Sequence, residues 1–394
     1  MRLFRSNIFK QWGIWFLGTF FSAIAGIVLT KYVDNQFSGI IIFGLILVFV
    51  LLLAFISYKE SDAFNLLNVI KNEDKKCNWE GIIRIAFPLS VPLWLSKNYE
   101  LRVKLGTHIR RACDNLIGLK KQQIIIDDTY VPVKTILSKT LIDDLGWTLY
   151  KVKNKRIGEV IKNIKSGIDL ASETKNINIV FKGYQHLSGI SCDRGEYTNM
   201  DNYHSKMLEF IKNDEFRNAM YKFALARNEL IRLKKMLNDF YENEKNEKTK
   251  KILEDIQFAG NYFKTNNPIE CTKTFCIEAD VYLIKTTYEK MNTAENLNQA
   301  KNLLQEGLKI CKEYQCRENF IQVLLKLIEI DQKRLDLLNL KEEEKLETIK
   351  DINNNIENVR AEIKNSDDEY LQISQIKQIL KTVNKRYSTP KINL

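Results

Sequence analysis

The sequence lacks the signatures of the common catalytic and metal sites. It contains no Walker A loop, no G-x-G-x-x-G following a strand, no H-E-x-x-H and no G-x-S-x-G. Its three histidines, His108, His186 and His204, are dispersed, and none of its seven cysteines has C-x-x-C spacing. We therefore expect no metal, no cofactor, no enzymatic activity and reduced cysteines in a cytosol.

Proline and glycine are also scarce, at 5 and 16 of 394 residues, which removes most turn and helix-breaking signals. The composition, 45% hydrophobic and 28% charged, excludes a largely disordered chain. An all-α fold with short connections is expected. The net charge of +11 is spread along the chain among acidic residues, so it predicts no specific nucleic-acid partner, although it suits an anionic lipid surface.

The first 60 residues contain two long apolar runs. Residues 11–30 and 35–58 carry no charge, and at ~1.5 Å per residue each is long enough for a hydrocarbon core of ~30 Å. We predict transmembrane helices at about 11–31 and 36–58, in contact with membrane lipids. Lysine and arginine flank the pair, which predicts a two-span protein of a bacterial inner membrane with both termini cytoplasmic.

Small residues recur on one face of the first predicted span. Gly18, Ser22 and Gly26 are spaced four apart, a pattern that lets another helix approach closely. The neighbouring helix is either the second span of the same hairpin or a helix of another copy in a homo-oligomer.

Residues 61–137 are expected to form an interfacial or linker helical region. Its apolar stretch 79–101 is interrupted by Arg84, Pro88 and Pro92, so it either dips into the headgroup layer or packs under the following domain. Arg102 and His108 then have the R-x5-H spacing that resembles the motif of HEPN ribonucleases, and the resemblance implies catalysis of RNA cleavage. The residue after the arginine is usually polar in that family, whereas here it is Val103, and a basic helix is the alternative.

Residues 138–322 show internal repetition. The segment IKSGIDLA around Gly167 aligns with LQEGLKIC around Gly307, 140 residues later, which is four times 35. An amphipathic segment precedes each copy, so the unit is helix A, turn, helix B. These units resemble tetratricopeptide-like repeats, and the resemblance implies an α-solenoid that binds a protein or peptide in a groove lined by A helices. Polar residues expected in that groove are Asp144, Thr148, Lys151, Gln185, Asn202, Arg227 and Asn228.

Residues 323–394 become strongly charged and helical. Apolar residues follow steps of three and four at Ile349, Ile352, Ile356, Val359 and Ile363, and NSDDE at 365–369 then offers the start of a last helix that ends near Lys385. This layout predicts a helical hairpin that caps the solenoid or a coiled coil with a second chain. The sequence as a whole predicts a transmembrane hairpin, a tetratricopeptide-like α-solenoid and a C-terminal helical hairpin. The leading functional hypothesis is a membrane-anchored scaffold or adaptor that recruits or senses a protein. A membrane-disrupting effector of a bacterial anti-phage system and a HEPN-like ribonuclease are the alternatives.

Overall fold

The computed structural model describes residues 62–95, 98–152, 156–211, 213–314 and 316–364. They belong to two units, the first ending at Pro88 and the second beginning at Leu89. In the first unit, α3 (Asp62–Lys75) and α4 (Trp79–Ala86) pack on one another, and the division at Pro88 falls within the short helix η1 (Phe87–Leu89). Asn78 caps α4, since its side chain accepts a hydrogen bond of 3.1 Å from the Gly81 amide.

The second unit is built almost entirely from helices. In chain order its elements are α5 (Ser90–Leu95), α6 (Tyr99–Gly118), β1 (Gln123–Ile126), β2 (Thr129–Pro132), α7 (Val133–Lys139), a π-helix (Thr140–Thr148), α8 (Leu149–Lys151), α9 (Ile157–Glu173), α10 (Ile177–Arg194), α11 (Tyr197–Leu208), α12 (Glu215–Lys235), η3 (Leu237–Asp239), α13 (Glu242–Asn266), α14 (Pro268–Tyr288), η4 (Lys290–Asn292), α15 (Thr293–Glu313), α16 (Arg317–Leu337) and α17 (Glu342–Lys364).

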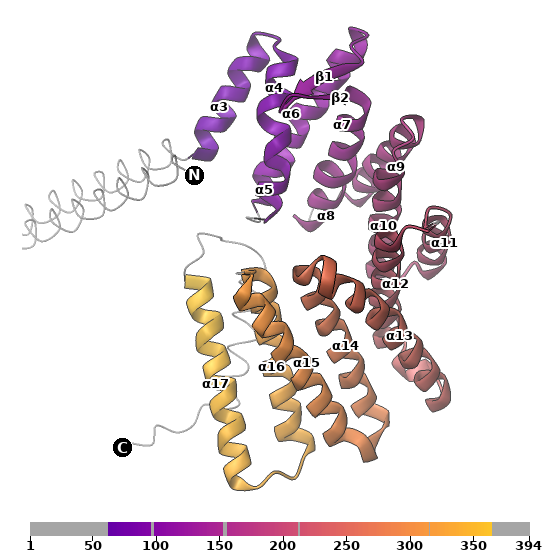
Figure 1. Ribbon diagram of the computed structural model, residues 1–394, viewed down its shortest axis with the longest axis vertical. Helices are drawn as coiled ribbons and strands as arrows, with labels where there is room; N and C mark the ends of the chain where they lie inside the picture. Colours follow the sequence, from indigo (N-terminus) through magenta and orange to yellow (C-terminus); the bar gives the residue numbers. More distant parts are fainter. Residues whose placement is uncertain (1–61, 96–97, 153–155, 212, 315, 365–394) are drawn as a thin grey trace, which may run out of the picture. The chain divides into compact units, whose positions relative to one another are not determined.

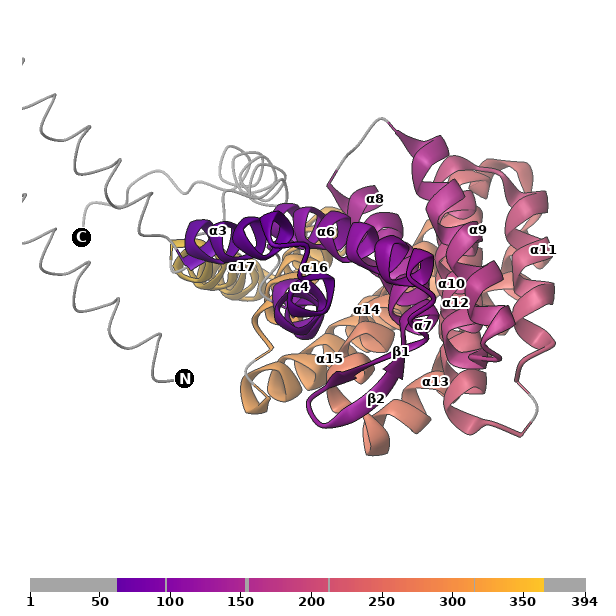
Figure 2. The ribbon, with the colours of Figure 1, turned by 90° about the horizontal axis from the view of Figure 1, so that it is seen from above.

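A short antiparallel hairpin interrupts the region expected to be helical. Strands β1 and β2 pair with Ile126 opposite Thr129, and a two-residue turn joins them (Figure 2). Both turn residues, Asp127 and Asp128, have positive φ angles of 46° and 62°, as tight hairpin turns require. Three successive isoleucines before the turn favour the extended conformation over a helix.

From α7 onward the helices alternate between two roles. The A helices are α10, α12, α14 and α16, together with the continuous segment formed by α7, the π-helix and α8. The B helices are α9, α11, α13, α15 and α17. Each A helix packs against the B helix that follows it and, except for the last one described, α16, against the next A helix (Figure 1). Because each pair buries its apolar stripe on the next, the arrangement is solenoid-like and the all-α prediction is confirmed.

Glycines stand where these helices cross most closely. A Cβ atom on Gly167 of α9 would lie 2.6 Å from Ile142 Cγ1 in the π-helix. A Cβ on Gly146 of the π-helix would overlap Ile164, and one on Gly183 of α10 would overlap Ile168. Ile142, Ile164 and Ile168 belong to one buried cluster, so missing side chains on one helix make room for isoleucines on its neighbour.

The helix pairs are longer than the predicted period. Gly167 lies in α9 and Gly307 in α15, and these B helices are three pairs apart rather than four. The 140-residue offset therefore covers three units. Helix α13 alone has 25 residues, which is why a spacing near 35 does not describe the array.

The apolar seam predicted near the C-terminus is used inside the chain. Ile352, Ile356 and Val359 of α17 are buried against Leu324 and Ile328 of α16. The partner that the structure shows for this seam is therefore α16 of the same chain. The two helices form the last A–B pair, so the predicted boundary at residue 322 falls inside α16. The final helix predicted beyond residue 364 lies outside the described residues.

The predicted fold needs correction at its N-terminal end. Among the residues that the structure describes, no helix is long and apolar enough to cross a membrane. The long helices all carry charged side chains, whose transfer into hydrocarbon is costly. A transmembrane hairpin is therefore not part of the fold that the structure supports. The segments 11–31 and 36–58 lie outside the described residues, as do Gly18, Ser22 and Gly26, and the inner-membrane location stays a prediction.

Candidate functional site

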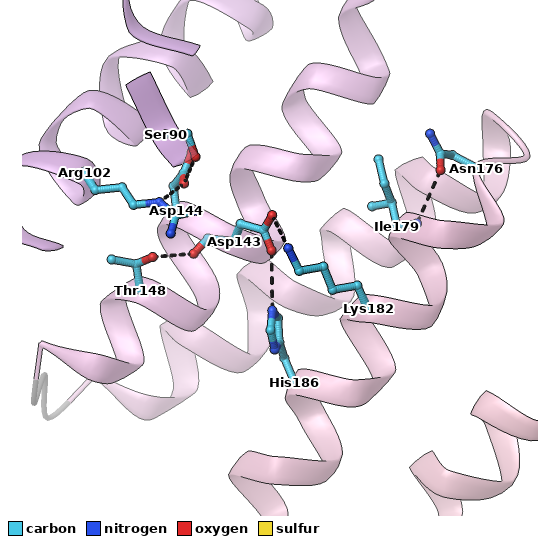
Figure 3. Close-up of polar contacts among 9 residues, drawn as sticks. All are labelled: Ser90, Arg102, Asp143, Asp144, Thr148, Asn176, Ile179, Lys182 and His186. Carbon is cyan, nitrogen blue, oxygen red and sulfur yellow. Dashed lines mark hydrogen bonds and ion pairs between the residues drawn. The ribbon is translucent and has the colours of Figure 1, made fainter. Parts of the chain in front are cut away.

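The π-helix between α7 and α8 carries two adjacent buried carboxylates. A π-helix has a wider turn than an α-helix and is often found at functional sites. Here it places Asp143 and Asp144 in contact with different neighbouring helices (Figure 3). Thr148 stabilises this turn, since its Oγ1 donates a hydrogen bond of 2.7 Å to the Asp143 carbonyl oxygen. The π-helix is thus bonded to α6 through Asp144 and to α10 through Asp143.

Asp144 is bound by groups from α5 and α6. Arg102 Nε and Ser90 Oγ donate to the same carboxylate oxygen, Asp144 Oδ1, at 2.6 and 2.7 Å. Arg102 and Asp144 are only 5% and 2% exposed. Burial raises the pKa of Asp144, and the attraction of Arg102 offsets part of this effect.

A glycine brings α6 close enough for this ion pair to form. A Cβ atom on Gly106, one turn after Arg102, would lie 2.8 Å from Asp144 Cβ. The Arg102 guanidinium also lies over the Trp94 ring, with its Cζ 5.1 Å from the ring centroid. Arg102 is therefore held on both sides inside the second unit.

Asp143 is bound by groups from α10. Lys182 Nζ donates to Asp143 Oδ2 at 2.8 Å, and His186 Nε2 lies 3.4 Å from Oδ1 (Figure 3). Burial by itself would raise the pKa of Asp143, but Lys182 and His186 together hold it below the usual range. Burial lowers the pKa of His186, so this imidazole is neutral near pH 7 and donates its Nε2 proton to Asp143.

The start of α10 fixes the position of these two groups. The Asn176 side chain accepts a hydrogen bond of 3.3 Å from the Ile179 amide and so caps the helix (Figure 3). Lys182 and His186 follow four residues apart, on one face of α10.

An aromatic and cationic cluster continues from His186 toward the surface. The Trp147 ring stacks on His186 with centroids 4.5 Å apart and planes 4° apart. Lys151 Nζ lies 4.4 Å from the centroid of the Trp147 ring. Tyr150 donates a hydrogen bond of 2.9 Å to Asp193 Oδ2, and Arg227 of α12 lies 3.9 Å from Asp193 Oδ1.

We call the set Trp147, Tyr150, Lys151, Asp193 and Arg227 the Trp147 face. Its members come from three successive A helices. Trp147, Tyr150 and Arg227 are half-buried, whereas Lys151 and Asp193 are exposed. The face therefore combines apolar rings with both signs of charge on the side of the A helices.

The residues predicted to line a groove fall into three groups. Lys151 and Arg227 are brought together on the Trp147 face, and Gln185 lies half-buried on α10. Asn202 is exposed on α11, a B helix, and thus away from the A helices. The other three, Asp144, Thr148 and Asn228, are interior residues with partners inside the chain and present no surface to a second molecule.

Asn228 joins α10, α11 and α12. Its Nδ2 donates to His204 Nε2 at 3.1 Å and lies 3.3 Å from Ser188 Oγ. Burial lowers the pKa of His204 to about 4, so the neutral ring accepts this bond. Asp144, Thr148 and Asn228 were predicted to line a groove because they are polar, and the sequence did not reveal that all three are buried.

The arginine of the R-x5-H motif has an internal partner. Arg102 is buried against Asp144, and His108 lies half-buried further along α6. A catalytic arginine must reach a phosphodiester, and this guanidinium is already bonded inside the fold. The geometry thus favours a structural role for Arg102.

Trp147, Asp143 and Lys182 were not singled out from the sequence, and His186 was named there only as one of three dispersed histidines. The available signal was the pair of aspartates within LIDDLGWTL, where an apolar run surrounds two charges. Buried carboxylates require partners, and a basic residue or histidine on a neighbouring helix is the expected one. Which helix supplies it depends on the packing.

Within the described part of the chain, no group of three or more histidine, cysteine or acidic residues is arranged to hold a metal ion. The chain matches no protein-family model and no curated protein.

Proposed function

We propose that the helical repeats recognise a protein or peptide partner, and that the Trp147 face is the contact surface. The observation that carries the proposal is the stacking of a half-buried tryptophan on a buried histidine where three A helices meet. Helical arrays of this kind use a surface built from successive repeats for recognition. The protein would then act as a scaffold or adaptor.

The residue types on the face suit binding. Tryptophan, tyrosine and arginine dominate the residues that contribute most to binding free energy at protein interfaces. Trp147 is held by His186 and Lys151, so it loses little conformational freedom when a partner covers it. A partner with an apolar anchor beside a carboxylate would contact the ring and the cations Lys151 and Arg227.

The buried charges beneath the face support a fixed arrangement. Asp143 ties the π-helix to α10 through Lys182 and His186, and Asp144 ties it to α6 through Arg102. A binding site gains affinity when such contacts hold its residues in place before the partner arrives.

Photo-crosslinking in cells tests the proposal. A photoreactive amino acid replaces Lys151 on the Trp147 face, and in a matched control it replaces Lys206, an exposed lysine on the B helix α11. We expect position 151, but not position 206, to crosslink one defined protein. Equal crosslinking at both positions, or none at position 151, would contradict the proposal.

A further inference from the structure

Three of the cysteines gather where α14, α15 and α16 meet. Cys276, Cys311 and Cys316 all belong to or pack against one apolar cluster. Cys311 is buried in the last turn of α15, whereas Cys316 is half-buried just before α16. The sequence spacing alone did not predict this, because residues five apart on a continuous helix do not face one another.

The end of α15 brings two of these cysteines together. The Cys316 amide donates a hydrogen bond of 3.0 Å to the Cys311 carbonyl oxygen. A bond across five residues that closes a helix is typical of a Schellman motif, and a contact between the side chains at its two ends frequently accompanies that motif. Consistent with this, the Cys316 thiol donates to the Cys311 carbonyl oxygen at 3.7 Å, and its side chain packs against the apolar cluster that contains Cys311.

We propose that Cys311 and Cys316 form a reversible disulfide when the protein meets hydrogen peroxide. The half-buried Cys316 sulfur takes one oxygen from the peroxide and becomes a sulfenic acid, and one water is released. The Cys311 sulfur then attacks Cys316 Sγ, the S–O bond breaks, and the hydroxyl leaves with the Cys311 proton as a second water. Two thiols are oxidised and one peroxide is reduced to two waters.

The surroundings favour this order of events. Burial raises the pKa of Cys311 to about 12, so at neutral pH it stays a thiol and reacts slowly with a peroxide in solution. Cys276 of α14 shares the cluster, and burial raises its pKa to about 12 as well. The backbone bond at the end of α15 joins Cys316 to Cys311, not to Cys276. The disulfide would thus close the connection that leads into α16.

Peptide mapping of the full-length protein tests the proposal. Trypsin cleaves after Lys309, Lys312 and Arg317, so the two cysteines fall on separate peptides, residues 310–312 and 313–317. The reduced protein is treated with hydrogen peroxide, alkylated and digested. We expect the two peptides to be recovered joined by a disulfide, at least tenfold more than without peroxide, and to separate after dithiothreitol.

Two variants serve as controls. Cys316→Ser should abolish the linked peptide, whereas Cys271→Ser, which removes a buried cysteine of α14 that hydrogen-bonds to Gly260, should leave it unchanged. A link from Cys276 to either cysteine, or oxidation of Cys316 without any linked peptide, would overturn the proposal. The wild-type map decides the question even if a variant fails to fold.

Discussion

The buried histidine of α11 should make the fold sensitive to acid. His204 is buried and receives a hydrogen bond from Asn228, and burial lowers its pKa from 6.5 to about 4. In the unfolded chain this histidine takes up a proton below pH 6.5, but in the folded chain it does so only near pH 4. Its contribution to stability is therefore complete above pH 6.5 and is lost as the pH falls from 6.5 to 4.

The size of the effect follows from the pKa difference. One pKa unit corresponds to about 1.4 kcal/mol. Protonation of His204 in the unfolded chain lowers the free energy of unfolding by about 2 kcal/mol at pH 5 relative to pH 7, and by roughly 3 kcal/mol near pH 4. Burial also lowers the pKa of His186, so this residue too reduces the stability of the fold as the pH falls.

Urea denaturation followed by circular dichroism, at pH 7 and pH 5, measures this loss. His204→Gln keeps an acceptor near Asn228 but cannot titrate, and His186 remains in both proteins. We expect the wild type to lose about 2 kcal/mol more than the variant between the two pH values. Equal losses in the two proteins would refute the assignment of a neutral buried imidazole at His204.

Two further substitutions test the packing around the π-helix. Arg102→Ala leaves Asp144 buried without its cation and should lower the free energy of unfolding by about 3–5 kcal/mol. Adding Asp144→Asn to this variant should restore part of the loss. Denaturation curves of Arg102→Ala that match the wild type would exclude a structural ion pair. Gly167→Ala forces a methyl group against Ile142 and should lower the free energy of unfolding by about 1–3 kcal/mol. Gly158→Ala in the same helix meets nothing within 4 Å and should be neutral or slightly stabilising. Similar melting temperatures for the two variants would contradict the close crossing.

The helices were predictable because their apolar spacing repeats locally. The pair of segments around Gly167 and Gly307 correctly marked two B helices, each preceded by an A helix. The period was wrong, because intervening helices such as α13 have extra turns that an alignment of two distant segments cannot count. The hairpin at residues 123–132 was missed because its turn uses two aspartates with positive φ rather than the usual glycine.

The site was only partly predictable. Lys151 and Arg227 have long side chains that reach the surface from almost any position on an A helix, and both lie on the Trp147 face. Asp144 and Asn228 are equally polar in sequence but are buried, because partners on other helices replace their water. Burial of a polar residue depends on tertiary contacts, which helical periodicity does not specify.

The most direct test of recognition by the Trp147 face is the affinity of the crosslinked partner for two alanine variants. Trp147→Ala removes the stacked ring, and Leu208→Ala removes a half-exposed apolar side chain from the B helix α11. We expect Trp147→Ala to weaken binding by at least about tenfold, equivalent to about 1.4 kcal/mol, with unchanged circular dichroism, and Leu208→Ala to bind like the wild type. Unchanged affinity for Trp147→Ala, or an equal loss for Leu208→Ala, would contradict recognition through this face.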